Sequence, residues 1–296
     1  MLEKKKQLNS EEKDLINEAL QIAGILEGSH NIQRAEAGMT NDMYLFERES
    51  GKYLLRIPGK GTEHLVNRQQ EAKVYELLKG KEITEEVIYI NGKNGIKVTK
   101  FLEDSHVCNI KDWDEVEACI KHLRQFHEMD LKIDHEFNIY KKIDEYEAKC
   151  KEEINRIEDY QVVRKQIMNL RGIIEHGDKR YCLCHIDPIT DNFLIENGNI
   201  YLIDWEYAAM CDPLIDIAMF CIYSELNKEE TDRIINIYFN GHSNQEERRK
   251  VYAYMAASAF LWVLWSEIKN ISGNNFEEYK MRQYEIAKEF CQYANR

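Results

Sequence analysis

The sequence lacks any long apolar run: no segment reaches the roughly 18 apolar residues that a membrane-spanning helix needs. The charged start, Met1 to Lys6, is followed by no apolar stretch of the kind found in secretion signals. There is also no internal repeat and no low-complexity linker. These absences predict a cytoplasmic protein that has no membrane partner.

Positive charge is scarce, with 40 Lys and Arg against 53 Asp and Glu and a net charge of −13. This balance disfavours nucleic acid as a partner, because nucleic acid attracts basic surfaces. The 8 cysteines form no C-x-x-C pair, so we expect reduced thiols rather than disulfides or a zinc site. Nothing in the sequence indicates an oligomeric state.

The 296 residues are enough for two lobes. Strand patterns cluster early in the chain, and helical patterns dominate after Glu103. We therefore predict an α+β, two-lobed fold with a small antiparallel-sheet lobe over 1–103 and a larger, mainly helical lobe over 104–296. The early strands are expected over 33–37, 43–47, 53–57, 88–90 and 96–99, with helices over 9–27 and 65–79. Later helices are expected over 113–129, 141–176, from 212 and over 245–270.

The stretch 184–206 carries the clearest chemical signal. Two short apolar runs, 193–195 and 200–203, flank an Asn-Gly turn and predict a hairpin. Asp187 and Asn192 precede the first strand and Asp204 follows the second, so the hairpin can bring them to one end. Phosphoryl transfer needs a carboxylate beside the acceptor hydroxyl and oxygen ligands for Mg²⁺. Asp187 suits the catalytic base, and Asn192 with Asp204 suits the metal, in the H-x-D-x-x-x-x-N pattern known from protein kinases.

The first lobe offers candidate nucleotide contacts. A short loop between two strands, Gly38, Met39, Thr40 and Asn41, could bring its backbone close to phosphate oxygens. Arg56 in a strand and Glu71 in the following helix could pair, as the strand Lys and helix Glu of kinases do. Backbone groups of Lys100, Phe101 and Leu102 could meet an adenine where the chain leaves the sheet. We predict ATP and Mg²⁺ as cofactors.

Two tryptophans stand three residues apart on the predicted helix 245–270, so Trp262 and Trp265 share one face. With Tyr279 and Tyr284 they could form an aromatic cage, which attracts a quaternary ammonium group through the ring quadrupoles. The alternative is an apolar helix packed into the core. Similarly, Asp216 could brace the catalytic loop through hydrogen bonds or could be a plain first-turn helix residue.

Taken together, these motifs resemble the choline/ethanolamine kinases, in particular the bacterial lic-type choline kinases of the aminoglycoside-phosphotransferase-like superfamily. The resemblance covers about residues 34–290. The sets that carry it are Gly38–Asn41, Leu55-Arg56, Gly59–Glu63, Asn67–Glu71, Cys184–Asp187 with Asn192, Ile203–Tyr207 and Trp262-x-x-Trp265-Ser266. The tryptophan motif is the most specific of them, since aminoglycoside kinases are not expected to carry it.

The resemblance implies transfer of phosphate from ATP to the hydroxyl of choline, giving phosphocholine. It implies Asp187 as base and Asn192 and Asp204 as Mg²⁺ ligands. It also implies a trimethylammonium pocket lined by Tyr207, Trp262, Trp265 and Tyr279. Two departures stand out. The spacing from Tyr279 to the next Arg differs by one, and Tyr223 replaces the acidic residue that eukaryotic members place near choline.

Two rival functions are compatible with the sequence. One is a kinase for another small cationic alcohol, such as ethanolamine, an aminoglycoside or an amino sugar, although a polyamine would call for carboxylates rather than paired Trp. The other is a nucleotide-binding pseudokinase, against which the intact Asp187, Asn192 and Asp204 argue.

Overall fold

The computed structural model describes residues 8–35, 41–59, 66–175 and 180–296 of the chain. The predicted loop residues Gly38, Met39 and Thr40 lie outside these ranges. The chain divides into two compact units, which are described separately. The first unit contains Met1–Val107 together with Asn192–Tyr207, and the second contains Cys108–Asp191 and Ala208–Arg296. The lobe boundary near residue 103 stays a prediction.

The first unit is built on an antiparallel sheet in the order β1-β2-β3-β5-β4. Its strands are β1 His30–Ala35, β2 Asn41–Arg48, β3 Gly51–Pro58, β4 Val87–Ile90 and β5 Lys97–Lys100. Two helices belong with it, α1 Ser10–Ile22 and α2 Arg68–Leu78. The side chain of Asn9 accepts a hydrogen bond from Glu12 N and caps α1, and that of Asn67 caps α2.

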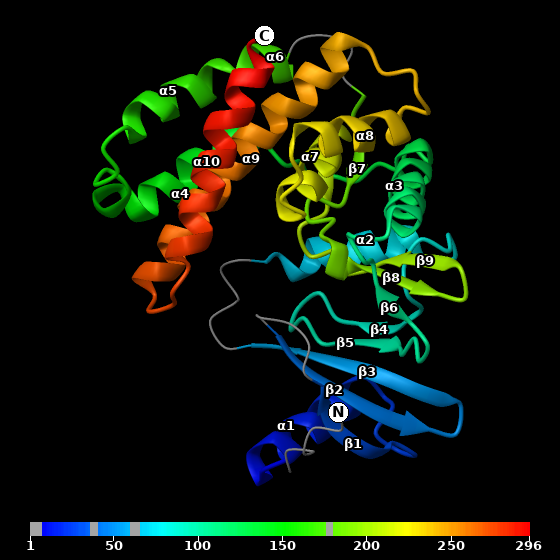
Figure 1. Ribbon diagram of the computed structural model, residues 1–296. Helices are drawn as coiled ribbons and strands as arrows, with labels where there is room; N and C mark the ends of the chain where they lie inside the picture. Colours follow the sequence, from blue (N-terminus) through cyan, green and yellow to red (C-terminus); the bar gives the residue numbers. More distant parts are fainter. Residues whose placement is uncertain (1–7, 36–40, 60–65, 176–179) are drawn as a thin grey trace. The chain divides into compact units, whose positions relative to one another are not determined.

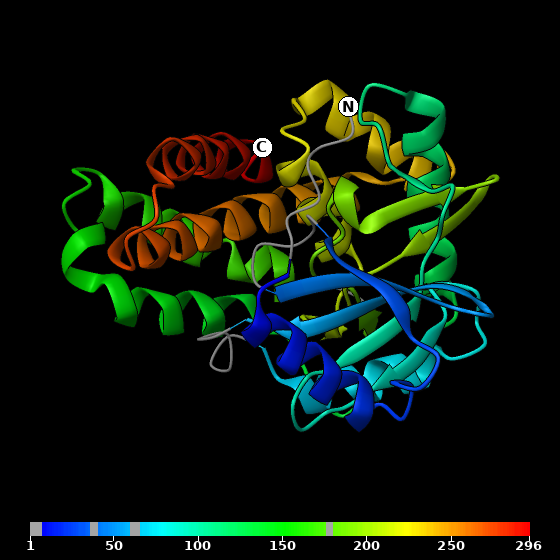
Figure 2. The ribbon, with the colours of Figure 1, turned by 90° about the horizontal axis from the view of Figure 1, so that it is seen from below.

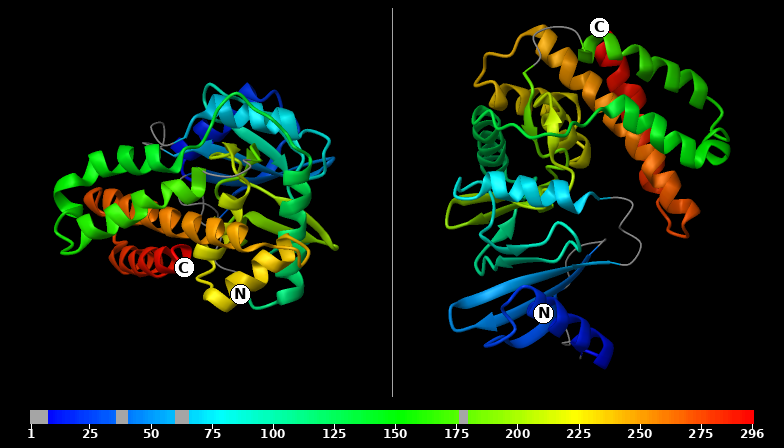
Figure 3. Two further views of the ribbon diagram at one scale, coloured as in Figure 1. Left: turned by 90° about the horizontal axis from the view of Figure 1, so that it is seen from above. Right: turned by 180° about the vertical axis from the view of Figure 1, so that it is seen from behind.

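Strand β3 shows why the two helices lie on opposite sides of this sheet (Figures 1 and 3). Tyr53, Leu55 and Ile57 alternate along β3 and join the apolar cluster that contains Ile16 and Leu20 of α1. Arg56 points to the other face, where it pairs with Glu71 of α2. The period-two alternation of a strand therefore packs α1 on one face and directs a buried cation at α2 on the other.

A second, three-stranded sheet of the first unit contains the predicted hairpin. Its order is β6-β8-β9, with β6 His106–Val107, β8 Phe193–Glu196 and β9 Asn199–Leu202. The turn between β8 and β9 has Asn197 at φ 51° and Gly198 at φ 81°, the left-handed conformations that a two-residue hairpin turn requires. The Asn-Gly signal thus predicted both the turn and the pairing correctly.

The second unit is mainly helical, with α9 at its centre (Figures 1 and 2). Helix α9 runs beside α10 and also packs against α4, α5, α6 and α7. The helices are α3 Trp113–Glu128, α4 Ile139–Ile154, α5 Tyr160–Asn169, α6 Arg171–Glu175, α7 Leu214–Tyr223, α8 Lys228–Tyr238, α9 Gln245–Ile271 and α10 Glu277–Ala294. Short strands β7 Cys182–Cys184 and β10 Ala209–Cys211 pair with each other, and a 3₁₀ turn covers Thr190–Asn192.

Helix α9 amends the expectation that no segment resembles a membrane span. By length and composition it could cross a bilayer, but 83% of its apolar window is buried inside the protein. The core helix of a soluble protein passes the same test, so α9 carries no argument for a membrane. All 8 cysteines are free and buried, as expected for reduced core thiols.

Candidate active site

The β8–β9 hairpin places two predicted metal ligands at one end. Phe193 pairs with Leu202 as the last rung of the ladder. Beyond that rung, the Ile203 N–H donates to the Asn192 carbonyl at 2.9 Å. Asn192 and Asp204 therefore leave neighbouring strands at the same end. A carboxylate and an amide oxygen form the kind of donor set that Mg²⁺ prefers, so the chemistry of these two residues fits the ion, and their role as its ligands stays a prediction.

The segment after β9 is held in an unusual conformation. Asp204 has φ 64°, a left-handed value that a non-glycine residue adopts at a cost and that recurs at functional sites. The next side chain, Trp205, is fully buried. Its indole N–H donates to the Leu202 carbonyl at 2.7 Å and to Thr84 Oγ1 at 3.1 Å. The buried indole thus ties the Asp204 segment to β9 and to the loop before β4.

The predicted pair of Arg56 and Glu71 is present and buried. Both guanidinium Nη atoms donate to the Glu71 carboxylate, and Arg56 Nη2 also donates to the Gly95 carbonyl at 3.0 Å. Burial alone would raise the pKa of Glu71, but the hydrogen bonds and charge of Arg56 outweigh it and lower that pKa to about 2. Glu71 is therefore ionised near neutral pH. The role of this pair in holding phosphates stays a prediction.

Arg68 and Glu206, to which the sequence reasoning gave no role, extend this pair into a larger polar cluster. Arg68 Nη1 donates to Glu71 Oε2 at 2.9 Å and to Glu206 Oε2 at 3.0 Å, and Nη2 donates to Asn41 Oδ1 at 3.0 Å. Burial, followed by the charge of Asp204, raises the pKa of Glu206 to about 7. We refer to Asn41, Arg56, Arg68, Glu71 and Glu206 as the polar cluster.

Asp216 braces the loop that leads into Asp187, in agreement with the first of the two alternatives predicted for this residue. The backbone N–H of His185 donates to Asp216 Oδ2 and that of Ile186 to Oδ1, each at 2.7 Å. Asp216 Oδ2 also lies 2.9 Å from Nε2 of His127, whose Nδ1 lies 2.8 Å from the Tyr238 hydroxyl. This fully buried network sets the backbone that enters Asp187.

Tyr279 of α10 lies within the electrostatic reach of Asp187. Burial raises the pKa of the Tyr279 hydroxyl, and the charges of Asp187 and then Glu225 raise it further. Tyr279 and Asp187 both belong to the second unit. Glu225, which the sequence reasoning passed over, forms an ion pair with Arg282. Glu225 stands two positions after Tyr223 in the sequence.

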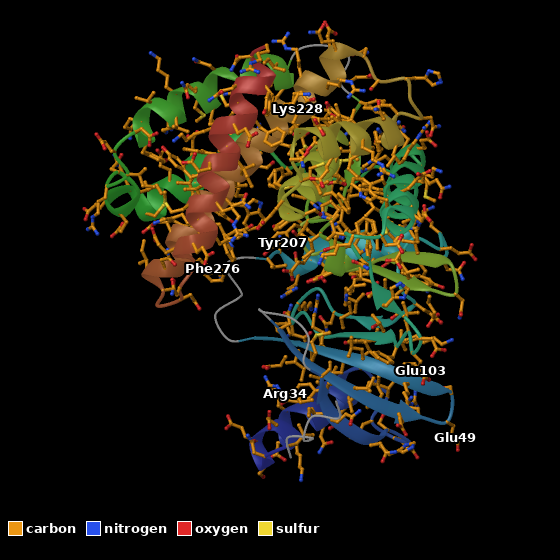
Figure 4. All side chains as sticks on the ribbon, in the orientation of Figure 1. Arg34, Glu49, Glu103, Tyr207, Lys228 and Phe276 are labelled. Carbon is orange, nitrogen blue, oxygen red and sulfur yellow. The ribbon has the colours of Figure 1, made fainter. Side chains whose placement is uncertain are left out.

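Trp262 and Trp265 form a continuous row with two further aromatic rings. Adjacent ring centroids lie 5.2 Å apart for Tyr223–Trp262, 5.2 Å for Trp262–Trp265 and 5.1 Å for Trp265–Phe276, all in edge-to-face geometry. Phe276, just before α10, is a fourth member that the sequence did not predict (Figure 4). We call Tyr223, Trp262, Trp265 and Phe276 the aromatic row.

Burial along α9 is interrupted at the two tryptophans. Every residue from Lys250 to Glu267 is buried except Trp262 and Trp265, which are only partly covered. Both indoles therefore keep part of their surface uncovered, which leaves a ring surface for an ammonium group, and their place in a cage stays a prediction. Tyr284, in contrast, is 1% exposed and donates its hydroxyl to Asp159 at 2.8 Å, so it has a structural contact elsewhere. Its predicted place in the cage is wrong.

The remaining predicted contacts lie in the first unit. Tyr207, half-buried, ends the hairpin segment of that unit. The N–H groups of Lys100 and Phe101 already donate to the carbonyls of Glu86 and Lys52, each at 2.9 Å. These two amides are therefore used within the sheet. The adenine contact predicted for residues 100–102 would therefore use the other backbone groups of these residues.

Comparisons with known proteins point to one family. The model of the family described as choline/ethanolamine kinase matches residues 32–259. Protein LicA of Haemophilus influenzae is 26% identical over 264 residues, which cover 84% of this chain and 77% of that protein. The crystal structure of the choline kinase LicA from Streptococcus pneumoniae matches with a TM-score of 0.80 at 27% identity, covering 96% of this chain and 100% of that one. A crystal structure of LicA in complex with AMP gives 0.76 at 26% identity, covering 95% and 98%.

Proposed function

Because this chain belongs to the choline/ethanolamine kinase family, we propose that it transfers the γ-phosphate of ATP to the hydroxyl of choline, giving phosphocholine. The family makes the chain a nucleotide-using kinase of a small alcohol, on the two-lobed kinase-like fold. Choline as that alcohol, Mg²⁺ as the metal and Asp187 as the base are the proposal. A cytoplasmic location stays a prediction.

The partial exposure of Trp262 and Trp265 carries the choice of choline. A trimethylammonium group is weakly hydrated and gains attraction from the face of each aromatic ring, about 1–2 kcal/mol when desolvated. Each ring of the aromatic row contacts the next, all four are partly uncovered, and the two indoles interrupt an otherwise buried stretch of α9 from Lys250 to Glu267. The ammonium of ethanolamine is more strongly hydrated, so it would gain less from the same rings.

The predicted site residues take different parts in the proposed reaction. Asp187 would orient the choline hydroxyl and accept its proton, from a loop whose backbone Asp216 holds. Arg56, kept in place by Glu71, would hold phosphate oxygens of ATP. Asn192 and Asp204 would hold Mg²⁺, which supplies positive charge to the phosphates as they separate.

An ADP-release assay coupled to a chromogenic readout tests the proposal. We expect turnover with choline, a kcat/KM for ethanolamine at least about tenfold lower because ring attraction is lost, and no turnover with an aminoglycoside panel. Asp187→Ala is the blank. Equal kcat/KM values for choline and ethanolamine would show that the aromatic row does not select choline. Activity on aminoglycosides alone would show that the protein phosphorylates aminoglycosides instead of choline.

Trp262→Ala separates the row from general packing. We expect a rise of about tenfold or more in the KM for choline, with the KM for ATP unchanged, because only the ammonium contacts are lost. Trp113→Ala is the matched control. Trp113 also contacts a cation, with Arg233 Cζ 3.9 Å from its ring centroid, but it belongs to α3 and is not a member of the aromatic row. A normal choline KM in Trp262→Ala would point to a different binding surface.

A further inference from the structure

We propose that Arg68 is a positioning residue for the phosphate donor, which acts by tying three segments of the first unit into one geometry. The inference deepens the proposed function and rests on it for the identity of the donor. The three segments are the start of β2 at Asn41, the first turn of α2 at Glu71, and the segment after Asp204 at Glu206. Each one borders a group that the proposed reaction assigns to nucleotide or metal.

The contacts of Arg68 are few and specific. Nη1 bridges Glu71 Oε2 at 2.9 Å and Glu206 Oε2 at 3.0 Å, while Nη2 reaches Asn41 Oδ1 at 3.0 Å. The side chain of Arg68 is 11% exposed, and those of Glu71 and Glu206 are 1% and 5% exposed. Charge-assisted hydrogen bonds this well shielded from water hold position firmly.

Arg68 is the cation that Glu71 and Glu206 share. Both carboxylates are almost fully shielded from water, and each forms an ion pair with Arg68 Nη1. Arg56 directs its fork at Glu71, which leaves Arg68 as the residue that forms an ion pair with Glu206 in the described part of the chain. Removing Arg68 takes away the donors that join Glu206 to Glu71 and Asn41. The segment from Asp204 to Glu206 would then no longer be tied to α2 and to the start of β2.

The planar fork matters as much as the charge. A guanidinium presents several donors in fixed directions, so one side chain can serve two carboxylates and an amide, whereas a lysine ammonium is a point charge. The stem is held too. A Cβ added at Gly95, in the turn between β4 and β5, would come within 3.0 Å of Arg68 Cγ and Cδ and 2.6 Å of Pro58 Cγ. Glycine at this position lets the turn pack directly on the Arg68 stem.

A binding measurement on the full chain tests Arg68 without using the alcohol. MgADP affinity is determined by calorimetry for the wild type, Arg68→Lys and Arg68→Gln, with thermal unfolding recorded for each. We expect at least tenfold weaker MgADP binding for Arg68→Gln and a smaller, still measurable loss of about threefold or more for Arg68→Lys, which keeps the charge and loses the fork. The KM for MgATP should rise while the KM for the alcohol stays constant.

Arg164→Gln is the matched control. Arg164 of α5 also bridges two carboxylates, Glu147 and Asp144, but in the second unit. The MgADP affinity of Arg164→Gln should stay within twofold of the wild-type value. Gly95→Ala, which crowds the Arg68 stem, should weaken MgADP in the same direction as Arg68→Lys.

Wild-type MgADP affinity in Arg68→Lys would overturn the proposal, and so would parallel losses of nucleotide affinity, alcohol affinity and folded protein in that variant. If instead the wild type binds MgADP but does not phosphorylate choline, the proposed function fails while the role of Arg68 stands. The two failures are therefore distinguishable.

Discussion

The buried carboxylate of Asp216 holds the backbone of Ile186 in a left-handed conformation. The Ile186 N–H donates to Asp216 Oδ1 at 2.7 Å, and Ile186 sits at φ 71°, a left-handed value that β-branched residues avoid. Such a conformation costs about 1–3 kcal/mol and persists only where the surroundings enforce it. The buried carboxylate therefore stores strain in the residue directly before the proposed base, Asp187.

Asp216→Asn tests this brace. The amide presents an NH₂ group to a backbone N–H donor, so one of the two loop hydrogen bonds is lost and the loop relaxes. We expect kcat to fall about 100-fold, the loss typical of a misplacement of about 1 Å in the reacting groups, with KM values changed less than threefold. Steady-state kinetics and thermal unfolding measure this. Asp232→Asn, which alters an ion-paired acid of α8, should leave kcat unchanged; a normal kcat in Asp216→Asn contradicts the brace.

Phe276→Leu tests the member of the aromatic row that the sequence did not predict. Leucine keeps an apolar side chain against Trp265 but removes the ring face. We expect the kcat/KM for choline to fall about five- to tenfold, because one cation–π contact contributes about 1 kcal/mol. The value for ethanolamine should change little. If both substrates lose activity equally, Phe276 supports the fold of the α9–α10 turn and does not bind the ammonium.

Tyr284→Phe should separate α10 residues that support the fold from those that meet the substrate. The change removes a hydroxyl that donates to Asp159 at 2.8 Å. The expected loss is about 1 kcal/mol in the free energy of unfolding, with no change in the KM for choline. Urea denaturation and kinetics report the two quantities. A raised KM for choline in Tyr284→Phe would show that Tyr284 contacts the substrate after all.

Glu71 makes the stability of the protein depend on acid pH. Its pKa is about 2 in the folded protein against an ordinary value of 4.5, because Arg56 overcomes the opposing effect of burial. The stabilisation is therefore complete above about pH 4.5 and is lost as the pH falls toward 2. Arg68 and Lys97 face Glu71 as well and act in the same direction.

Glu71→Gln should remove this acid dependence, which amounts to roughly 3 kcal/mol across that window. Urea denaturation of the wild type and the variant between about pH 3 and 6 gives the two slopes of unfolding free energy against pH. Glu117→Gln, in an exposed pair with Lys121, should keep the wild-type slope. Identical slopes for the wild type and Glu71→Gln would show that the pair titrates like an exposed one.

Trp205→Phe should loosen the segment that carries Asp204. Phenylalanine fills most of the indole volume but donates no hydrogen bond to Leu202 or Thr84. We expect a loss of about 1–3 kcal/mol in unfolding free energy, the cost of unpaired buried acceptors, and a higher Mg²⁺ concentration for half-maximal activity. Trp113→Phe serves as the control. An unchanged Mg²⁺ requirement would mean that the position of Asp204 does not depend on the hydrogen bonds of the indole.

Local patterns in the sequence were sufficient for most elements and for the residues that follow from spacing. The Asn-Gly pair predicted the β8–β9 hairpin because a two-residue turn needs left-handed residues, and the hairpin in turn placed Asn192 with Asp204. Three-residue spacing placed Trp262 beside Trp265 because residues three apart share a helix face. These relationships depend on backbone geometry over a few residues, which the sequence alone determines.

Contacts between distant segments were decided only by tertiary structure. Arg68 meets Glu206 across 138 positions, and nothing near either residue indicates the partner. Phe276 joins the aromatic row because the turn before α10 folds back on Trp265. Tyr284 lies outside the row. It is five residues after Tyr279 on the same helix, which turns its side chain about 140° away from that of Tyr279. Such pairs form when whole elements pack, so their energies depend on burial and on partners that local propensity does not encode.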